Sequence, residues 1–252
     1  WNNTADVVNK AVRAKNLGLR VMIDFHYSDG WADPGQQTKP AAWAAMSFAD
    51  MKTALGTHTT AVLTAIKNAG VTPEWVQVGN ETNDGMLWPE GKASTNMSNF
   101  TQLVNTGYAA SKAVFPTAKV IVHISNGSDN SLFRWIFDGL KNNGANYDVI
   151  GMSLYPNVSS WSISTQQCLN NMNDMIARYN KEVMVVEVGM GWQYSFECNA
   201  FLADIIQKTK SIANNKGLGV LYWEPQAYNW MGYGLGAFDA TGKPTVALDA
   251  FR

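Results

Sequence analysis

Short, almost uninterrupted apolar segments alternate along this chain with longer segments in which apolar residues recur at helical spacing. The short segments are rich in Val, Ile and Leu, which is typical of strands in a parallel sheet covered on both faces. They are residues 19–25, 74–78, 119–124, 149–154, 183–188 and 218–223. Helical spacing predicts helices over residues 6–16, 48–68, 99–114, 131–142, 165–179 and 200–214, and a last helix that begins near Pro244.

Six predicted strands, each followed by a helix, and one helix before the first strand make a βα series. Two α/β architectures fit this order: a doubly wound open sheet and a (β/α)8 barrel of the TIM type. The segment after the first strand reads HYSDGWADPG and lacks the glycine-rich turn of a dinucleotide-binding sheet. Polar residues follow all six strands, and barrel enzymes build their active sites at that rim. The pattern therefore favours a barrel in a single domain, residues 1–252, in which the first two βα units are missing.

Composition excludes several functional classes. The chain has 252 residues, 15% of them charged, and a net charge of −1. This near-neutral balance disfavours a nucleic-acid binder and an electrostatic membrane binder, and no apolar run is long enough to span a membrane. Ten Trp residues predict either partly exposed rings that stack on sugar faces or a Trp-rich core. Three His residues and no GxSxG motif disfavour a Ser–His–Asp hydrolase.

Two glutamates lie where barrel enzymes place their chemistry. Glu81 follows the second strand and Glu187 lies near the end of the fifth. Burial of a carboxylate is unfavourable unless it has partners or a chemical role. Glycosidic cleavage uses such a pair, because one carboxyl group protonates the leaving oxygen while the other attacks the anomeric carbon or activates water. The structural alternative is that each glutamate forms an ion pair or accepts a backbone hydrogen bond.

Two histidines and an aspartate accompany these acids. Asp24 and His26 alternate at the end of the first strand, so their side chains share one face. They are interpreted as hydrogen-bonding groups that line a pocket, with a satisfied core pair as the alternative. His123, in the strand KVIVHI, either orients a carboxylate or contacts substrate, or is a buried, satisfied histidine.

Several long motifs resemble glycoside hydrolase family 53, the endo-β-1,4-galactanases that cut the β-1,4-galactan chains of pectin (type I arabinogalactan). They are VMIDFHYSDGWADPGQQTKPAAW, WVQVGNETNDGMLWPEG, VMVVEVGMGW, YWEPQ and GLGAFDATGKPT. The resemblance implies a (β/α)8 barrel, a retaining hydrolase that acts on galactan or its oligosaccharides, no cofactor, and a secreted, periplasmic or cell-surface location. It makes Glu81 the acid/base and Glu187 the nucleophile.

The resemblance also assigns binding roles. Asn80 is expected to hydrogen-bond the sugar 2-hydroxyl or to position Glu187, Tyr155 to donate to Glu187, and Trp223 to form a platform under the sugar. Asp24, His26 and His123 are expected to complete the pocket. Trp88 and Trp192 either form more distant subsites or pack within their own loops.

Alternatives remain open at this level. The rival functions are another β-glycanase of the same clan, such as a mannanase or a cellulase, and a truncated glycan-binding barrel with little turnover. Absence of two βα units would leave open strand edges, so self-association through the open side is expected. The resemblance also leaves a structural calcium ion possible in the loops after the fifth and sixth predicted strands. The candidate ligands there are only Asn199, Asn229 and Asp239. Cys168 and Cys198 either form one disulfide or stay free.

Overall fold

The computed structural model describes residues 2–252, and its internal contacts divide the chain into two compact units. The N-terminal unit consists of residues up to His123 together with Ile136–Val149. The C-terminal unit consists of Ile124–Trp135 and Ile150–Arg252.

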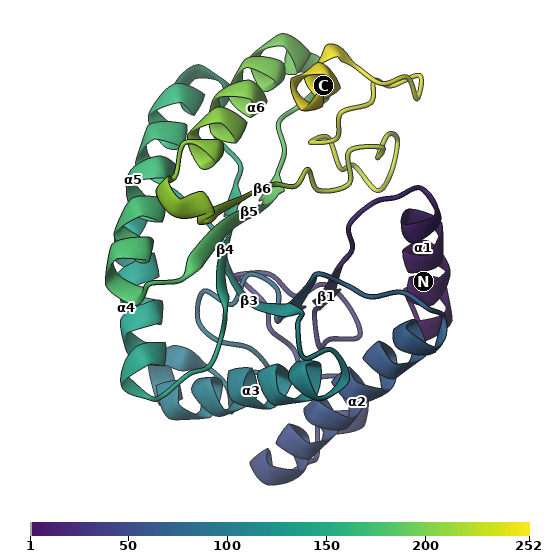
Figure 1. Cartoon of the computed structure of the whole chain (residues 1–252), viewed down its shortest axis with the longest axis vertical. Helices are drawn as coiled ribbons and strands as arrows, with labels where there is room; N and C mark the ends of the chain where they lie inside the picture. The colour runs from purple at the N-terminus through teal and green to yellow at the C-terminus, as the bar shows by residue number, and fades with distance from the viewer. Residues whose placement is uncertain (1) are drawn as a thin grey trace. The chain divides into compact units, whose positions relative to one another are not determined.

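The N-terminal unit alternates helices with parallel strands (Figure 1). Its elements are α1 (Thr4–Asn16), β1 (Met22–Phe25), a 3-10 turn η1 (Ala41–Trp43), α2 (Phe48–Asn68), β2 (Trp75–Val78), α3 (Ala93–Val114) and β3 (Lys119–Ile124), whose last residue belongs to the other unit. Strand β1 pairs in parallel with β2, with Met22 opposite Trp75, and β2 pairs in parallel with β3. All four residues of β2 are buried, as its continuous apolar character predicts.

Two elements, α4 (Asn130–Asn142) and β4 (Val149–Leu154), belong partly to each unit. The C-terminal unit continues with short 3-10 turns and the remaining regular elements. These are η2 (Val158–Ser160), α5 (Trp161–Tyr179), β5 (Glu182–Val188), η3 (Trp192–Tyr194), α6 (Ser195–Lys210), η4 (Ala213–Asn215), β6 (Gly217–Val220) and η5 (Val246–Phe251). Strands β5 and β6 are parallel, and α5 and α6 run beside each other and cover them (Figure 1). The predicted α/β class is confirmed.

Helix α3 begins six residues before the predicted start, and the difference has a local cause. Asn96 has non-helical angles inside the element (φ −152°, ψ 83°), so the helix is kinked there. The Asn96 side chain accepts a hydrogen bond from the Asn99 backbone N–H at 3.0 Å, as an N-cap residue does. The apolar period thus begins at residue 99 because the second, longer part of the helix begins there.

The chain leaves β6 earlier than the pattern predicts. The strand ends at Val220, although the Leu221 and Trp223 N–H groups still donate to the carbonyls of Val185 and Val188 at 2.9 and 3.1 Å. These bonds keep the segment after β6 alongside β5 and its nucleophile candidate. The expected last helix is a 3-10 helix, η5, rather than an α-helix.

The two cysteines are free thiols, so the disulfide alternative is wrong. Cys168 on α5 and Cys198 on α6 are both buried. The Cys168 Sγ lies 3.6 Å from the Met152 Sδ, and the Cys198 Sγ lies 3.8 Å from the Tyr222 hydroxyl. Burial raises the pKa of Cys168 to about 12 and that of Cys198 to about 11. Each thiol is therefore a small, protonated core group.

Candidate active site

Three polar side chains are joined at the ends of β1 and β2 in the N-terminal unit. Asp24 Oδ1 accepts a hydrogen bond from Gln77 Nε2 at 2.6 Å, and its Oδ2 accepts one from His26 Nε2 at 3.0 Å. The other ring nitrogen of His26 accepts the Ala32 backbone N–H at 3.5 Å. Both carboxylate oxygens of Asp24 are therefore engaged by strand-end side chains. The predicted common face of Asp24 and His26 is confirmed by this pair.

Asn80 links this cluster to His123. Its Nδ2 donates to the Ala32 carbonyl at 2.8 Å, while its Oδ1 lies 3.0 Å from His123 Nδ1 and 3.3 Å from Gln77 Nε2. His123 is fully buried, and burial lowers the pKa of its ring to about 3. The ring is therefore neutral. Its Nδ1 lies 3.0 Å from the Asn80 amide oxygen and 3.4 Å from the Glu81 backbone nitrogen. One N–H of the Asn80 amide has no partner among residues 2–252, so it is available to a ligand.

Glu81 follows Asn80 in a tight turn after β2. Gly79 has φ 85°, and a Cβ there would lie 2.6 Å from Thr82 Cγ2, so only glycine fits. Glu81 itself has φ 44°, a left-handed conformation that costs a non-glycine residue roughly 1–3 kcal/mol. The Thr82 N–H donates to the His123 carbonyl at 2.8 Å and fixes the turn to β3. Such strained residues cluster at active sites, and this one is a half-buried acid.

The second glutamate lies in the C-terminal unit, on β5. The Tyr155 hydroxyl, at the end of β4, donates to Glu187 Oε2 at 3.1 Å. A Cβ on Gly189 would lie 2.8 Å from Tyr155 Cε1, so the glycine two residues after Glu187 makes room for this ring. The hydrogen bond that the resemblance predicted between Tyr155 and Glu187 is therefore present in the structure.

The segment after β6 carries a cluster of three aromatic rings. Trp223 and Tyr233 pack edge to face with ring centroids 4.9 Å apart, and Trp230 lies 6.2 Å from Tyr233. Glu224 has φ 46°, and its Oε2 accepts a hydrogen bond from Gln226 Nε2 at 2.8 Å. A third glutamate thus follows the tryptophan predicted as the sugar platform.

Trp88 is held within its own loop, whereas the backbone at Trp192 bonds to the segment after β6. The Trp88 Nε1 donates to the Asp84 carbonyl at 2.8 Å, and the Lys92 ammonium lies 4.8 Å from the centre of its ring. Trp192 is half-buried in η3, and its backbone N–H donates to the Gly234 carbonyl at 3.1 Å. The contacts of Trp88 fix its ring, and the subsite role remains a prediction for both tryptophans.

Four residues near the predicted site residues were not predicted from the sequence: Gln37, Gln77, Glu224 and Tyr233. Gln77 is the one polar residue in the apolar strand WVQV, and that interruption is a signal that could have identified it. Gln37 donates to the Asn80 carbonyl at 2.8 Å from a loop without any periodic pattern. Tyr233 and Glu224 likewise come from irregular segments, where neither spacing nor neighbours single them out.

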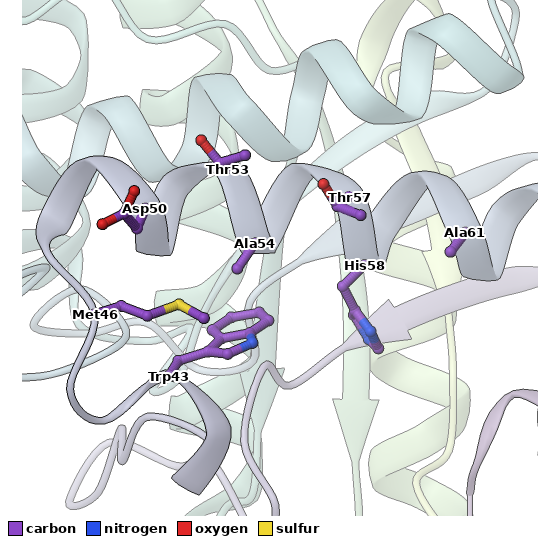
Figure 2. Close-up of a pocket in the computed structure, with 8 residues that line it drawn as sticks. All are labelled: Trp43, Met46, Asp50, Thr53, Ala54, Thr57, His58 and Ala61. Carbon is purple, nitrogen blue, oxygen red and sulfur yellow. The ribbon is translucent and has the colours of Figure 1, made fainter.

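An open groove of about 470 Å³ lies elsewhere in the N-terminal unit, beside the first half of α2 (Figure 2). Its lining residues are Trp43, Met46, Asp50, Thr53, Ala54, Thr57, His58 and Ala61. The rings of Trp43 and His58 meet nearly at right angles with centroids 6.2 Å apart, and burial lowers the pKa of His58. None of the predicted site residues lines this groove, so it is distinct from the strand-end clusters.

The described part of the chain offers neither a metal-binding cluster nor a membrane-spanning helix. Across residues 2–252, no three His, Cys, Asp or Glu side chains are grouped so that they could hold a metal ion. Among the helices of the same part of the chain, none has the length and apolar character needed to cross a membrane.

Comparisons with known proteins agree with the motifs. The model of glycosyl hydrolase family 53 matches residues 1–251. An arabinogalactan endo-beta-1,4-galactanase of Thermothelomyces thermophilus is 31% identical over 100% of this chain and 85% of its own length. The GH53 catalytic domain of Ignisphaera aggregans is 28% identical, with a TM-score of 0.88 over 99% of this chain and 78% of that one. A structure of fungal beta-1,4-galactanases gives the same TM-score and identity over 99% of this chain and 82% of that one.

These likenesses cover nearly the whole described chain, and they place its six-stranded fold in the (β/α)8-barrel class. The chain belongs to glycosyl hydrolase family 53 and is a glycoside hydrolase.

Proposed function

We propose that this chain hydrolyses internal β-1,4-galactosidic bonds of galactan with retention of anomeric configuration, using Glu81 as acid/base and Glu187 as nucleophile. The observation that carries the proposal is the hydrogen bond from the Tyr155 hydroxyl to Glu187 Oε2, because it holds the carboxylate of the proposed nucleophile in one orientation. Family membership and the galactanase relatives support galactan as the substrate.

The reaction runs in two steps. In the first, ionised Glu187 attacks the anomeric carbon while protonated Glu81 gives its proton to the leaving oxygen, so that a glycosyl-enzyme ester forms. In the second, ionised Glu81 removes a proton from water, which attacks the same carbon and releases Glu187. Tyr155 holds Glu187 in one orientation throughout, and its proton stabilises the carboxylate when the ester breaks.

Asn80 and Trp223 bind the sugar. The remaining N–H of the Asn80 amide is directed to the 2-hydroxyl, a bond that strengthens as positive charge develops at the neighbouring carbon. Two contacts hold the amide in place: its oxygen lies 3.0 Å from Nδ1 of neutral His123, and its nitrogen donates to the Ala32 carbonyl at 2.8 Å. Trp223, braced by the edge-to-face contact with Tyr233, offers its face to the apolar side of the ring.

The test uses two isosteric substitutions and one matched control. Glu81→Gln and Glu187→Gln are each expected to lower kcat on galactan by at least about 10²–10⁴-fold, since each removes the ionisable oxygen that the step needs. Glu197→Gln, an exposed glutamate on α6, is the control and is expected to match the parent. Near-parental cleavage by both active-site variants would refute the assignment.

Four further measurements test the proposal and its rivals. Hydrolysis of galactan is compared with that of mannan, xylan and carboxymethylcellulose; preference for one of the last three would favour another β-glycanase. Binding of galacto-oligosaccharide without product would favour a glycan-binding barrel. Nuclear magnetic resonance of the first product distinguishes retention from inversion. Activity in the presence of EDTA is expected to equal activity without it, and its loss would point to a required metal ion.

A further inference from the structure

Gln77 is a polar side chain in the middle of a buried apolar strand. All four residues of β2 are buried, and Gln77 is 1% exposed. The parallel register of β1 and β2 places Gln77 opposite Asp24, so the two side chains lie on the same face of the sheet. A buried amide is unfavourable unless its hydrogen bonds are formed. The partners of this amide therefore indicate why the strand carries it.

The Gln77 amide nitrogen has two hydrogens, and its two acceptors are residues expected to bind the sugar. Nε2 donates to Asp24 Oδ1 at 2.6 Å and to Asn80 Oδ1 at 3.3 Å. The orientation of the amide follows from these partners, because an amide rotated by half a turn would present its own oxygen to two oxygens. The Asn80 oxygen is identified in the same way, since Asn80 Nδ2 donates to the Ala32 carbonyl at 2.8 Å. One nitrogen thus connects the end of β1 to the turn after β2.

The amide oxygen of Gln77 contributes no hydrogen bond to the fold. Oε1 is buried and accepts no hydrogen bond from any residue between 2 and 252. A buried polar group that is only partly satisfied is less favourable than a well-packed apolar side chain. The bonds to Asp24 and Asn80 are therefore what distinguishes Gln77 from the valines on either side of it.

Gln77 can affect a ligand only through these two partners. At 1% exposure its own side chain is out of reach of a sugar, whereas the Asp24 side chain is 27% exposed. Asp24 also accepts a hydrogen bond from His26 Nε2 at 3.0 Å, and Asn80 has one amide N–H available to a ligand. Gln77 lies behind both groups and contacts both of them.

We propose that Gln77 is a positioning residue whose two N–H groups hold Asp24 and Asn80 in a fixed orientation relative to each other. The available N–H of Asn80 then meets the sugar 2-hydroxyl without a search through other rotamers. This inference rests on the proposed function, because it takes Asn80 as the residue that binds the 2-hydroxyl. That bond strengthens in the transition state, so loss of its orientation lowers kcat more than it raises KM.

Two substitutions remove the pair of donors in different ways. Gln77→Met keeps the length of the side chain and has no N–H group. Gln77→Glu keeps its shape, and a carboxyl group carries at most one hydrogen, so it cannot serve both oxygens. Each is expected to lower kcat on galactan by about 10–10²-fold, with KM within about threefold of the parent. Gln166→Met removes an exposed amide that donates to Asn170 on α5, and this control is expected to match the parent.

A second readout does not depend on catalysis. The hydrogen exchange of the Asn80 side-chain N–H that bonds to Ala32 is followed by nuclear magnetic resonance of ¹⁵N-labelled protein, with Asn80→Ala identifying the signal. Both Gln77 variants should accelerate this exchange about 2–12-fold, the factor that corresponds to one hydrogen bond of ordinary strength. The side-chain N–H of Asn171, which donates to the Gly127 carbonyl at 2.9 Å, should exchange at the parental rate.

The outcomes separate positioning from a general contribution to the fold. Unchanged exchange at Asn80, equal acceleration at Asn171, or parental kcat in both Gln77 variants would overturn the proposal. Gln77→Met should also lower kcat less in an Asn80→Ala background than in the parent, and factors that multiply in full would show that Gln77 does not act through Asn80. Gln77→Glu fills the same space and decides the question if the methionine variant does not fold. The exchange measurement tests the positioning even if the parent fails to cleave galactan, a result that would reject the proposed function separately.

Discussion

Acid is expected to destabilise the folded chain through His123. Burial lowers the pKa of this ring to about 3; the nearby Asp24 opposes the shift and His26 adds to it. In the unfolded chain a histidine has a pKa of about 6.5. Between these two values the unfolded state binds one more proton than the folded state, so stability is complete above about pH 6.5 and is lost as the pH falls toward 3.

The expected size follows from this difference. Each pH unit in the interval changes the free energy of unfolding by about 1.4 kcal/mol, which gives a loss of about 2 kcal/mol between pH 7 and pH 5. His123→Asn is the matched variant, because its amide can both donate and accept hydrogen bonds, as a neutral imidazole does, but is not protonated in this pH range. Every other titrating group, including His58, is the same in both proteins.

The assay is urea unfolding at pH 7 and pH 5, followed by circular dichroism. The parent should lose about 2 kcal/mol more than His123→Asn between the two pH values. If both proteins lose the same amount, the buried, neutral state of His123 is not a source of acid sensitivity and the reasoning fails. A parent that gains stability at pH 5 relative to the variant would reverse the sign and exclude a lowered pKa.

Two more predictions concern packing and thiols. Gly107→Ala should cost about 1–3 kcal/mol in urea unfolding, because a Cβ there would lie 2.5 Å from Val78 Cγ1, where α3 crosses β2. Gly56→Ala serves as the control, because a Cβ at Gly56 would lie 3.2 Å from a side-chain methyl group, and it should lower the free energy of unfolding by less. Equal effects of the two substitutions would contradict the α3–β2 contact. Cys168 and Cys198 should react with a thiol reagent only after denaturation and without prior reduction. Finding no thiols in unfolded, unreduced protein would mean that they are paired.

Strand positions could be predicted from the sequence because burial on both faces leaves an unmistakable run of apolar residues. The predicted strands at 119–124 and 149–154 coincide with β3 and β4, all but one of whose residues are buried. The prediction failed at β6, where Gly217 and Gly219 weaken the strand and Gly219 has φ 141°. The end of that strand depends on tertiary bonds to β5, which leave no trace in local sequence.

The site was predictable only in part for the same reason. Glu81 and Glu187 could be selected because an acid after an apolar strand requires an explanation, and Tyr155 because of its place at the end of a strand. The connections among side chains were not predictable. Tyr233 lies in a loop, and its edge-to-face contact with Trp223 arises from folding rather than from any spacing along the chain.

Because Cys168 and Cys198 form no disulfide bond, production of the folded protein does not depend on an oxidising compartment. No oxidant and no disulfide isomerase is required for the chain to reach its native form, because the core around Cys168 and Cys198 is filled by the thiols themselves. A bacterial cytoplasm, with its reducing thiol pool, is therefore as suitable a host compartment as the periplasm. Adding a reductant during purification should leave the fold intact and protect it from crosslinking after accidental denaturation.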